Sequence, residues 1–116
     1  MNIFISSISS YVGYSTAIYL HLAGHTIIGS YRRYTNRVES LANLQNITLL
    51  KIDHSSTSGI PTLDFNIDLF INSTGDFPSH NVTEEDIIYA NTKTALMMSK
   101  YIKERRAPTL LINFST

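Results

Sequence analysis

Five short runs of apolar, β-forming residues alternate with helical segments along this chain, and this alternation limits the possible folds more than any other feature. The runs are continuously apolar, which is typical of strands buried on both faces of a sheet. They cover residues 2–6, 25–31, 47–52, 67–71 and 109–114. Strands of this kind that are connected through helices predict a parallel α/β sheet with helices on both faces.

The first two helical segments are recognised from the spacing of their apolar residues. Residues 14–23 form the first, and Gly24 follows at a position where a left-handed helix cap is favoured. Residues 36–43 form the second, which is short. Their apolar residues are Ala17, Ile18, Leu20 and Leu22 in the first, and Val38, Leu41 and Ala42 in the second.

The third helical segment, residues 83–103, is the longest. It opens with Thr83 as the N-cap and Asp86 three residues later, an acidic variant of the capping box. The stretch before the fourth strand carries Gly59 and Pro61, so we expect a loop there with at most one helical turn.

Right-handed crossovers leave few ways to arrange five parallel strands. The order that we predict is 3-2-1-4-5, a doubly wound sheet whose ligand lies beyond the carboxyl ends of the strands, near the switch between strands 1 and 4. Polar residues follow every strand at that edge: residues 6–13, Arg32 and Arg33, Asp53 and His54, residues 72–75, and Ser115 and Thr116. These are the candidate site residues.

Length and charge exclude several classes of protein. The 116 residues form one domain, 1–116, and nine basic and nine acidic residues cancel, which argues against nucleic acid and anionic membranes as partners. The chain has no cysteine, and its four histidines lack metal-ligand spacing with carboxylates, so no metal site is expected. The N-terminal MNIFISSISS is neither a signal peptide nor a membrane span, and we expect a cytoplasmic protein.

The strand-end segments together resemble the short-chain dehydrogenase/reductase superfamily, including its NAD-dependent epimerase/dehydratase branch. IDLFINSTG, residues 67–75, is similar to the family's fourth strand and its Asn-Asn-Ala-Gly; the next helix carries Asn91 at the family's characteristic asparagine. LLINFST resembles the strand with the active-site serine, and Thr116 falls at or one residue before that serine. The resemblance implies the N-terminal half of a Rossmann domain that ends before the family's catalytic tyrosine and lysine.

The phosphate-binding loop departs from the family. Its glycine-rich pattern would fall on SSISSYVG, residues 6–13, where Gly13 alone remains. Gly13 allows the helix to pack closely on the strand; Ser7 and Ser10 are the smallest replacements for the other glycines, and Tyr11 and Val12 complete the loop. The hydroxyls of Ser7 and Ser10 can donate to phosphate, but the Cβ of each serine hinders the approach of the backbone to a pyrophosphate and disfavours positive φ. Intact dinucleotide binding and a Rossmann half with little affinity therefore both stay open.

Arg32 and Arg33 follow the second strand, where NAD-preferring relatives carry an acidic residue. Two guanidiniums can hold a 2′-phosphate, so the resemblance implies NADP over NAD, with NAD possible. The alternative is a solvated basic turn.

The resemblance also suggests roles for the other strand-end residues. Asp53, followed by His54, would contact adenine or else cap a turn. Asn72, Ser73, Thr74 and Gly75 would lie under the cofactor ribose, with Asn72 also able to tie neighbouring strands together. Asn91 would hold its helix to the fourth strand, which supports a proton relay in complete relatives. Asn91 and Thr116 are thus the candidates for a part in catalysis.

Tyr89 and Lys93 match the Tyr-x-x-x-Lys spacing of the family's catalytic pair. In the family that pair follows the serine strand, whereas Tyr89 precedes LLINFST. The match is therefore interpreted as accidental.

Two functions are carried forward. The first is the NAD(P)-binding part of an oxidoreductase or sugar-nucleotide epimerase/dehydratase, with a dinucleotide cofactor and a small-molecule or sugar-nucleotide substrate. The second is a non-enzymatic binding or regulatory module with a degenerate cofactor loop. A receiver- or flavodoxin-like domain is disfavoured, because no acidic cluster follows the first strand.

A homo-oligomer is expected, through the apolar fifth strand or through Met97, Met98 and Tyr101 of the long helix.

Overall fold

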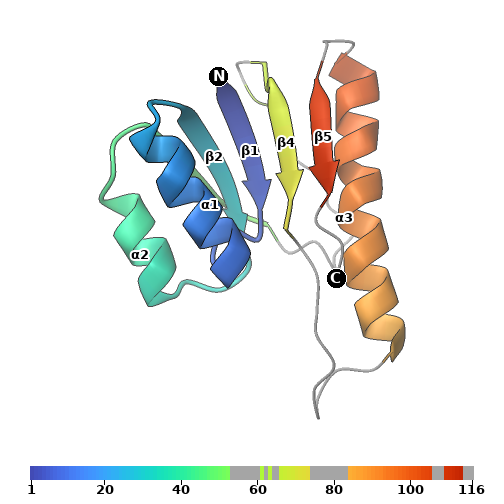
Figure 1. Ribbon diagram of the computed structural model, residues 1–116. Helices are drawn as coiled ribbons and strands as arrows, with labels where there is room; N and C mark the ends of the chain where they lie inside the picture. The colour runs from blue at the N-terminus through green and yellow to red at the C-terminus, as the bar shows by residue number, and fades with distance from the viewer. Residues whose placement is uncertain (53–60, 62, 64–65, 74–83, 106–108, 114–116) are drawn as a thin grey trace.

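The computed structural model describes residues 1–52, 61, 63, 66–73, 84–105 and 109–113, and its strands form one parallel sheet (Figure 1). The sheet order is β3-β2-β1-β4-β5, as predicted. The strands are β1 (Asn2–Ser6), β2 (Thr26–Tyr31), β3 (Ile47–Lys51), β4 (Leu69–Asn72) and β5 (Leu110–Asn113). The helices are α1 (Tyr11–Leu22), α2 (Asn36–Ala42) and α3 (Glu84–Arg105). The expected loop around Gly59 lies outside the described residues, as does the Thr83 cap.

Helices α1 and α2 pack on one face of the sheet and α3 on the other (Figure 1). Strand β1 serves both sides, since Ile3 and Ile5 join the core under α1 and Phe4 joins the core under α3. Alternate residues of a strand point to opposite faces, so a strand covered on both sides must be apolar throughout. This requirement explains the apolar run of β1, residues 3–5.

The core under α3 is partly aromatic. The Phe70 ring lies 5.2 Å from that of Phe4 and 5.6 Å from that of Tyr101, between centroids. Met98 and Tyr101 are buried in this core. The expectation that they form a free surface on the long helix was therefore wrong, because α3 turns this side toward β4 and β5.

Helix α1 differs from its predicted form at both ends. It begins at Tyr11 instead of residue 14, because Ser10 Oγ accepts a hydrogen bond from Gly13 N at 3.0 Å and caps it. Leu22 is 80% exposed and does not belong to the buried stripe; five residues beyond the buried Ala17, it lies about 140° around the helix. Gly24 has φ +90°, so the predicted left-handed position after the helix is confirmed.

Ile8, in the loop after β1, is fully buried and packs against β2 at Gly29. A Cβ added to Gly29 would lie 2.3 Å from Ile8 Cδ1 and 2.9 Å from its Cβ. The missing side chain in β2 is therefore what makes room for Ile8. This contact anchors the loop that follows β1.

The pairing of Ile8 with Gly29 is open to a double-mutant cycle. We expect Gly29→Ala to lower the free energy of unfolding by about 1–3 kcal/mol, through overpacking. In an Ile8→Ala background the new methyl group enters the vacated space, so Gly29→Ala should cost at least about 1 kcal/mol less there. Urea unfolding of the four proteins measures both values. Additive effects would contradict the contact.

Candidate functional site

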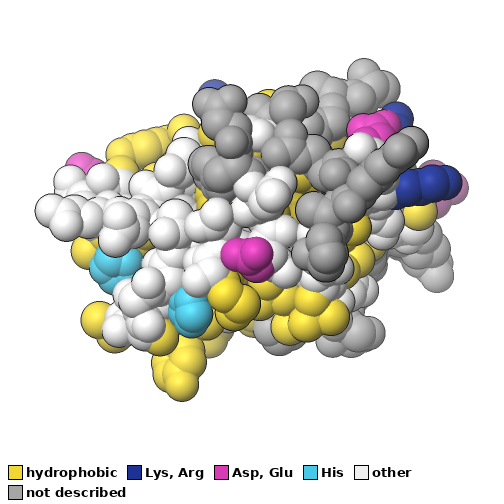
Figure 2. Space-filling model, turned by 90° about the horizontal axis from the view of Figure 1, so that it is seen from above, with side chains coloured by type: hydrophobic (Ala, Val, Ile, Leu, Met, Phe, Trp, Pro, Cys, Tyr) yellow, Lys and Arg dark blue, Asp and Glu magenta, His cyan; other side chains and the backbone are white. Residues whose placement is uncertain are grey.

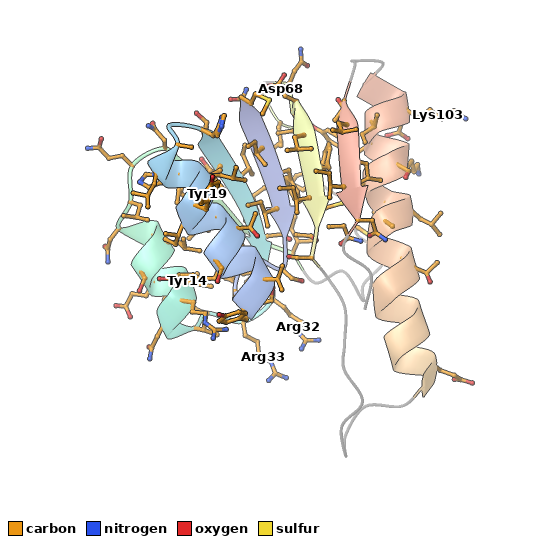
Figure 3. All side chains as sticks on the ribbon, viewed as in Figure 1. Tyr14, Tyr19, Arg32, Arg33, Asp68 and Lys103 are labelled. Atoms are coloured by element: carbon orange, nitrogen blue, oxygen red, sulfur yellow. The ribbon has the colours of Figure 1, made fainter. Side chains whose placement is uncertain are left out.

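The carboxyl ends of the strands meet at one edge of the sheet, and the predicted polar residues that the structure describes lie there. Ser6, Asn72 and Asn113 occupy equivalent positions on β1, β4 and β5. Arg32 and Arg33 follow β2 and project beyond this edge, whereas Asp68 lies at the opposite one (Figure 3).

The predicted residues divide into two groups. Those that the structure brings to this edge are Ser7, Ser10, Tyr11, Val12, Gly13, Arg32, Arg33, Asn72 and Ser73. Those outside the described residues are Asp53, His54, Thr74, Gly75 and Thr116; the backbone of Asn91 lies in α3, but its side chain is not described.

The opposite, amino-terminal edge has a different character. Histidine and acidic side chains lie there among apolar ones, with the Lys and Arg side chains at the periphery of the view (Figure 2). The Asn2 backbone N–H donates to Asp68 Oδ2 at 2.8 Å, and the N-terminal amine lies 3.2 Å from His25 Nδ1. The amino-terminal edge thus combines an acidic side chain with the N-terminal amine and histidine, whereas Arg32 and Arg33 lie at the carboxyl edge.

The turn after β1 keeps a glycine-like shape without glycine. Ser7 has φ +49°, in the left-handed region, and Ser10 N donates to Ser7 O at 2.9 Å. Ser30 supports the turn from β2: its Oγ accepts from Ser7 N at 3.2 Å and its carbonyl from Ile8 N at 2.9 Å. Ser10 has φ −67° and needs no glycine. Ser30 was missed by the sequence analysis, although a serine after Gly29 within an apolar strand was a signal.

Gly13 allows α1 to approach the strand ends closely. A Cβ there would lie 2.4 Å from Ser7 O and 2.9 Å from Ser73 Oγ. This is the packing role that the sequence analysis gave to Gly13. The start of α1 is thereby held against the ends of β1 and β4.

The start of α1 offers backbone donors at this edge. Tyr14 N makes the first helical bond, to Ser10 O at 2.8 Å, and Gly13 N is bonded to Ser10 Oγ. The N–H groups of Tyr11 and Val12 therefore have no acceptor within the helix. With the positive end of the helix dipole they favour an anion.

A third arginine joins Arg32 and Arg33. Arg37, in α2, donates from Nη1 to Ser9 O at 3.2 Å, and its Cζ lies 5.9 Å from the centre of the Tyr11 ring. In the described part of the chain none of the three guanidiniums is paired with a carboxylate. Arg37 was not predicted, because it does not follow a strand. It lies in α2 and contacts the loop after β1 through a tertiary contact. Three cationic side chains thus lie on the β2 side of the site.

A ladder of side-chain hydrogen bonds joins three strand ends. Ser6 Oγ donates to Asn72 Oδ1 at 2.7 Å, and Asn72 Nδ2 donates to Asn113 Oδ1 at 2.6 Å. Ser73 N donates to Ser6 Oγ at 3.1 Å. Asn72 therefore ties neighbouring strands together, one of the two roles considered for it. Asn113 was not predicted as a site residue, because its hydrogen bond with Asn72 cannot be read from the sequence.

Two findings concern other kinds of site. Among the described residues, no group of three or more His, Asp or Glu side chains is placed to hold a metal ion. No helix in the same part of the chain combines the length and apolar character needed to cross a membrane.

Comparisons of sequence find no family model and no curated protein that matches this chain. Comparison of structures finds several dehydrogenases and reductases. A 4-hydroxyisoleucine dehydrogenase complexed with NADH has a TM-score of 0.76 and 16% identity, over 99% of this chain and 54% of that one. The yeast methylglyoxal/isovaleraldehyde reductase complexed with NADPH has a TM-score of 0.71 and 18% identity, over 90% and 33%.

A short-chain dehydrogenase from Streptomyces avermitilis has a TM-score of 0.63 and 16% identity, over 94% of this chain and 47% of that one. The present chain thus spans between 33% and 54% of these three proteins. At such identities the likeness establishes the fold. The chain has the Rossmann fold found in short-chain dehydrogenases, and the predicted fold class is confirmed.

The left-handed turn at Ser7 generates a stability prediction. Ser7→Gly removes the Cβ that disfavours φ +49°, whereas Ser7→Ala keeps it. We expect the glycine variant to be more stable than the alanine variant by about 1 kcal/mol. Urea unfolding of both proteins measures the difference. An alanine variant of equal or higher stability would show that residue 7 does not need the left-handed conformation.

Proposed function

We propose that this chain is the dinucleotide-binding part of a short-chain dehydrogenase/reductase, or of a related sugar-nucleotide epimerase/dehydratase, and that it prefers NADP to NAD. The observation that carries the proposal is the turn at Ser7. It brings the start of α1, with two N–H groups lacking an acceptor within the helix, to the switch between β1 and β4 beside three arginines. Rossmann domains bind the pyrophosphate of a dinucleotide at this position.

The loop residues fit a dinucleotide in their conformation. The turn that usually needs glycine is formed by Ser7, and the close approach that needs Gly13 is retained. The N–H groups of Tyr11 and Val12 would hold the pyrophosphate. Ser10 Oγ accepts from Gly13 N and keeps its own proton to donate to a phosphate oxygen. A bound dinucleotide would supply hydride transfer, and these residues would bind and orient it.

The basic residues support NADP as the preferred form. Arg32 and Arg33 are exposed beyond β2, on the side where the adenosine half of a dinucleotide would lie. Guanidiniums hold a phosphate with paired, charge-assisted hydrogen bonds. Among the structural neighbours, the yeast reductase is complexed with NADPH and the 4-hydroxyisoleucine dehydrogenase with NADH, so both cofactors are compatible with this fold.

The remaining predicted residues keep their proposed roles. Asp53 with His54 would lie by the adenine, and Asn72, Ser73, Thr74 and Gly75 by the second ribose. Asn91 and Thr116 would contribute to catalysis in a protein with the length of the structural neighbours, acting on a small-molecule or sugar-nucleotide substrate. The cytoplasmic location stays a prediction from the sequence.

Replacing Arg32 and Arg33 together by alanine tests the preference for NADP. The double variant should bind NADPH about 1.5–3 kcal/mol more weakly, the range for charge-assisted hydrogen bonds, with NADH affected little. Isothermal titration calorimetry measures both affinities. Lys100→Ala together with Lys103→Ala removes the same charge from exposed positions of α3 and is the matched control. Equal losses for NADPH and NADH would show that the arginines do not read the 2′-phosphate.

The second candidate is a non-enzymatic binding or regulatory module. Gly13 N already donates to Ser10 Oγ, so this N–H is not free for a phosphate. Ser7 also carries a Cβ at a turn position that is usually glycine. Both features favour a loop that has lost its cofactor. Titration of the wild-type protein decides between the two. Binding of NADPH or of adenosine 2′,5′-bisphosphate supports the first function; no binding of either at millimolar concentration supports the second.

We also propose a homo-oligomer formed through β5. Leu110 is 64% and Ile112 40% exposed, while Leu111 packs into the core under α3. Among the described strands β5 pairs with β4 alone, and its other edge presents backbone donors and acceptors. Apolar, uncharged edges of this kind associate readily.

Leu110→Lys should convert the assembly to a monomer, because it places a charge on the exposed apolar side of β5 without altering the core. Light scattering at micromolar concentration measures the mass. Wild-type protein should exceed the monomer mass of 13.1 kDa, and the variant should match it. Leu96→Lys, at an exposed position of α3, is the control and should leave the mass unchanged. A wild-type mass of one chain would contradict the proposal.

A further inference from the structure

The hydrogen-bond ladder at the strand ends has a direction. A backbone N–H can only donate, so Ser6 Oγ accepts from Ser73 N and its own hydroxyl proton is left to donate elsewhere. The separation of 2.7 Å from Ser6 Oγ to Asn72 Oδ1 is that of an O–H donor with an oxygen acceptor. The Asn72 amide nitrogen therefore faces Asn113, where it donates to Oδ1.

This direction determines which atom Asn113 presents at its outer end. Its Oδ1 is occupied by Asn72 Nδ2, and its own Nδ2 takes no part in the ladder. Ser6 is fully buried and Asn72 1% exposed, whereas Asn113 is exposed. The ladder thus runs from the interior to the surface and ends on an amide donor whose orientation is held by buried partners.

The place of this donor follows from the strand order. The adenosine half of a dinucleotide lies on the β2 side of the switch point and the second nucleotide on the β4 side. Asn113 is aligned with Asn72 in the β4–β5 register, at the carboxyl edge. A donor there faces the half of the ligand that is distant from Arg32 and Arg33.

We infer that Asn113 is a further ligand-binding residue of this site, whose Nδ2 donates to an acceptor oxygen on the second nucleotide of the dinucleotide. The inference rests on the proposed function. Ribose hydroxyls and a carboxamide oxygen are the acceptors that this half of the ligand carries. Because the amide is already held in place, little side-chain entropy is lost when it binds.

Asn113→Asp is the sharpest test. The aspartate still accepts from Asn72 Nδ2, so the ladder persists, but its outer atom changes from a donor to an anionic acceptor. NADPH should bind at least about tenfold more weakly to this variant, in line with the loss of a hydrogen bond and an added repulsion. Adenosine 2′,5′-bisphosphate, which lacks the second nucleotide, should bind as it does to wild type. Asn66→Asp, the same change at an exposed position near the opposite edge, should leave both affinities unchanged.

A second measurement uses the wild-type protein, in case the variant folds poorly. The side-chain amide signals of Asn113 in a ¹H–¹⁵N spectrum are identified by their loss in Asn113→Ser. They should shift when NADPH is added and stay in place with adenosine 2′,5′-bisphosphate.

The outcomes separate the two proposals. If wild-type protein binds both ligands and Asn113→Asp binds NADPH equally well, the inference is overturned and the proposed function stands. If the variant loses affinity for both ligands alike, Asn113 supports the strand ends without touching the ligand, and the inference is again overturned. If wild-type protein binds neither ligand, the proposed function itself fails.

Discussion

Ser7 turns the chain into the left-handed region at the end of β1, and Ile8 then enters the space that Gly29 leaves open in β2. The turn leads directly into Ser10, which caps the start of α1. Ser30 Oγ accepts a hydrogen bond from Ser7 N, and the absence of a side chain at Gly13 lets α1 lie close to Ser7 O. The N–H groups of Tyr11 and Val12 at the start of α1 follow this turn directly in the chain. A serine can hold the turn because the surrounding contacts outweigh the modest cost of a positive φ.

The loop illustrates how side chains can replace glycine. In a glycine-rich loop the backbone itself approaches a phosphate, and the peptide N–H groups are the donors. In this chain Ser10 Oγ occupies Gly13 N and can donate its own proton. Tyr11 adds a 73% exposed ring, which Arg37 overlies while it also binds Ser9 O. The result is a polar loop that reaches the left-handed region at Ser7 without glycine.

The carboxyl edge has two chemically distinct halves. On the β2 side three arginines without carboxylate partners among the described residues create a local positive potential, although the whole chain is formally neutral. On the β4 side a neutral ladder of serine and asparagine side chains joins the strand ends. An extended ligand with an anionic end and a hydroxyl-rich end matches this division. The start of α1 lies between the two halves, at the switch between β1 and β4.

The sequence by itself determined the sheet order, because five short, mainly apolar runs that alternate with helical segments are typical of a parallel sheet, and right-handed crossovers leave few topologies. It also located the strand ends, and with them Arg32, Arg33, Asn72 and Gly13, since residues that follow parallel strands must share an edge. Only the tertiary structure decided the roles of Ile8, Ser30, Arg37 and Asn113. Each acts through a partner more than twenty residues away, and spacing within a segment carries no information about such contacts. The same limit explains the errors at Leu22 and at Met98 and Tyr101: an apolar residue in a helix is buried only if the neighbouring elements cover its side.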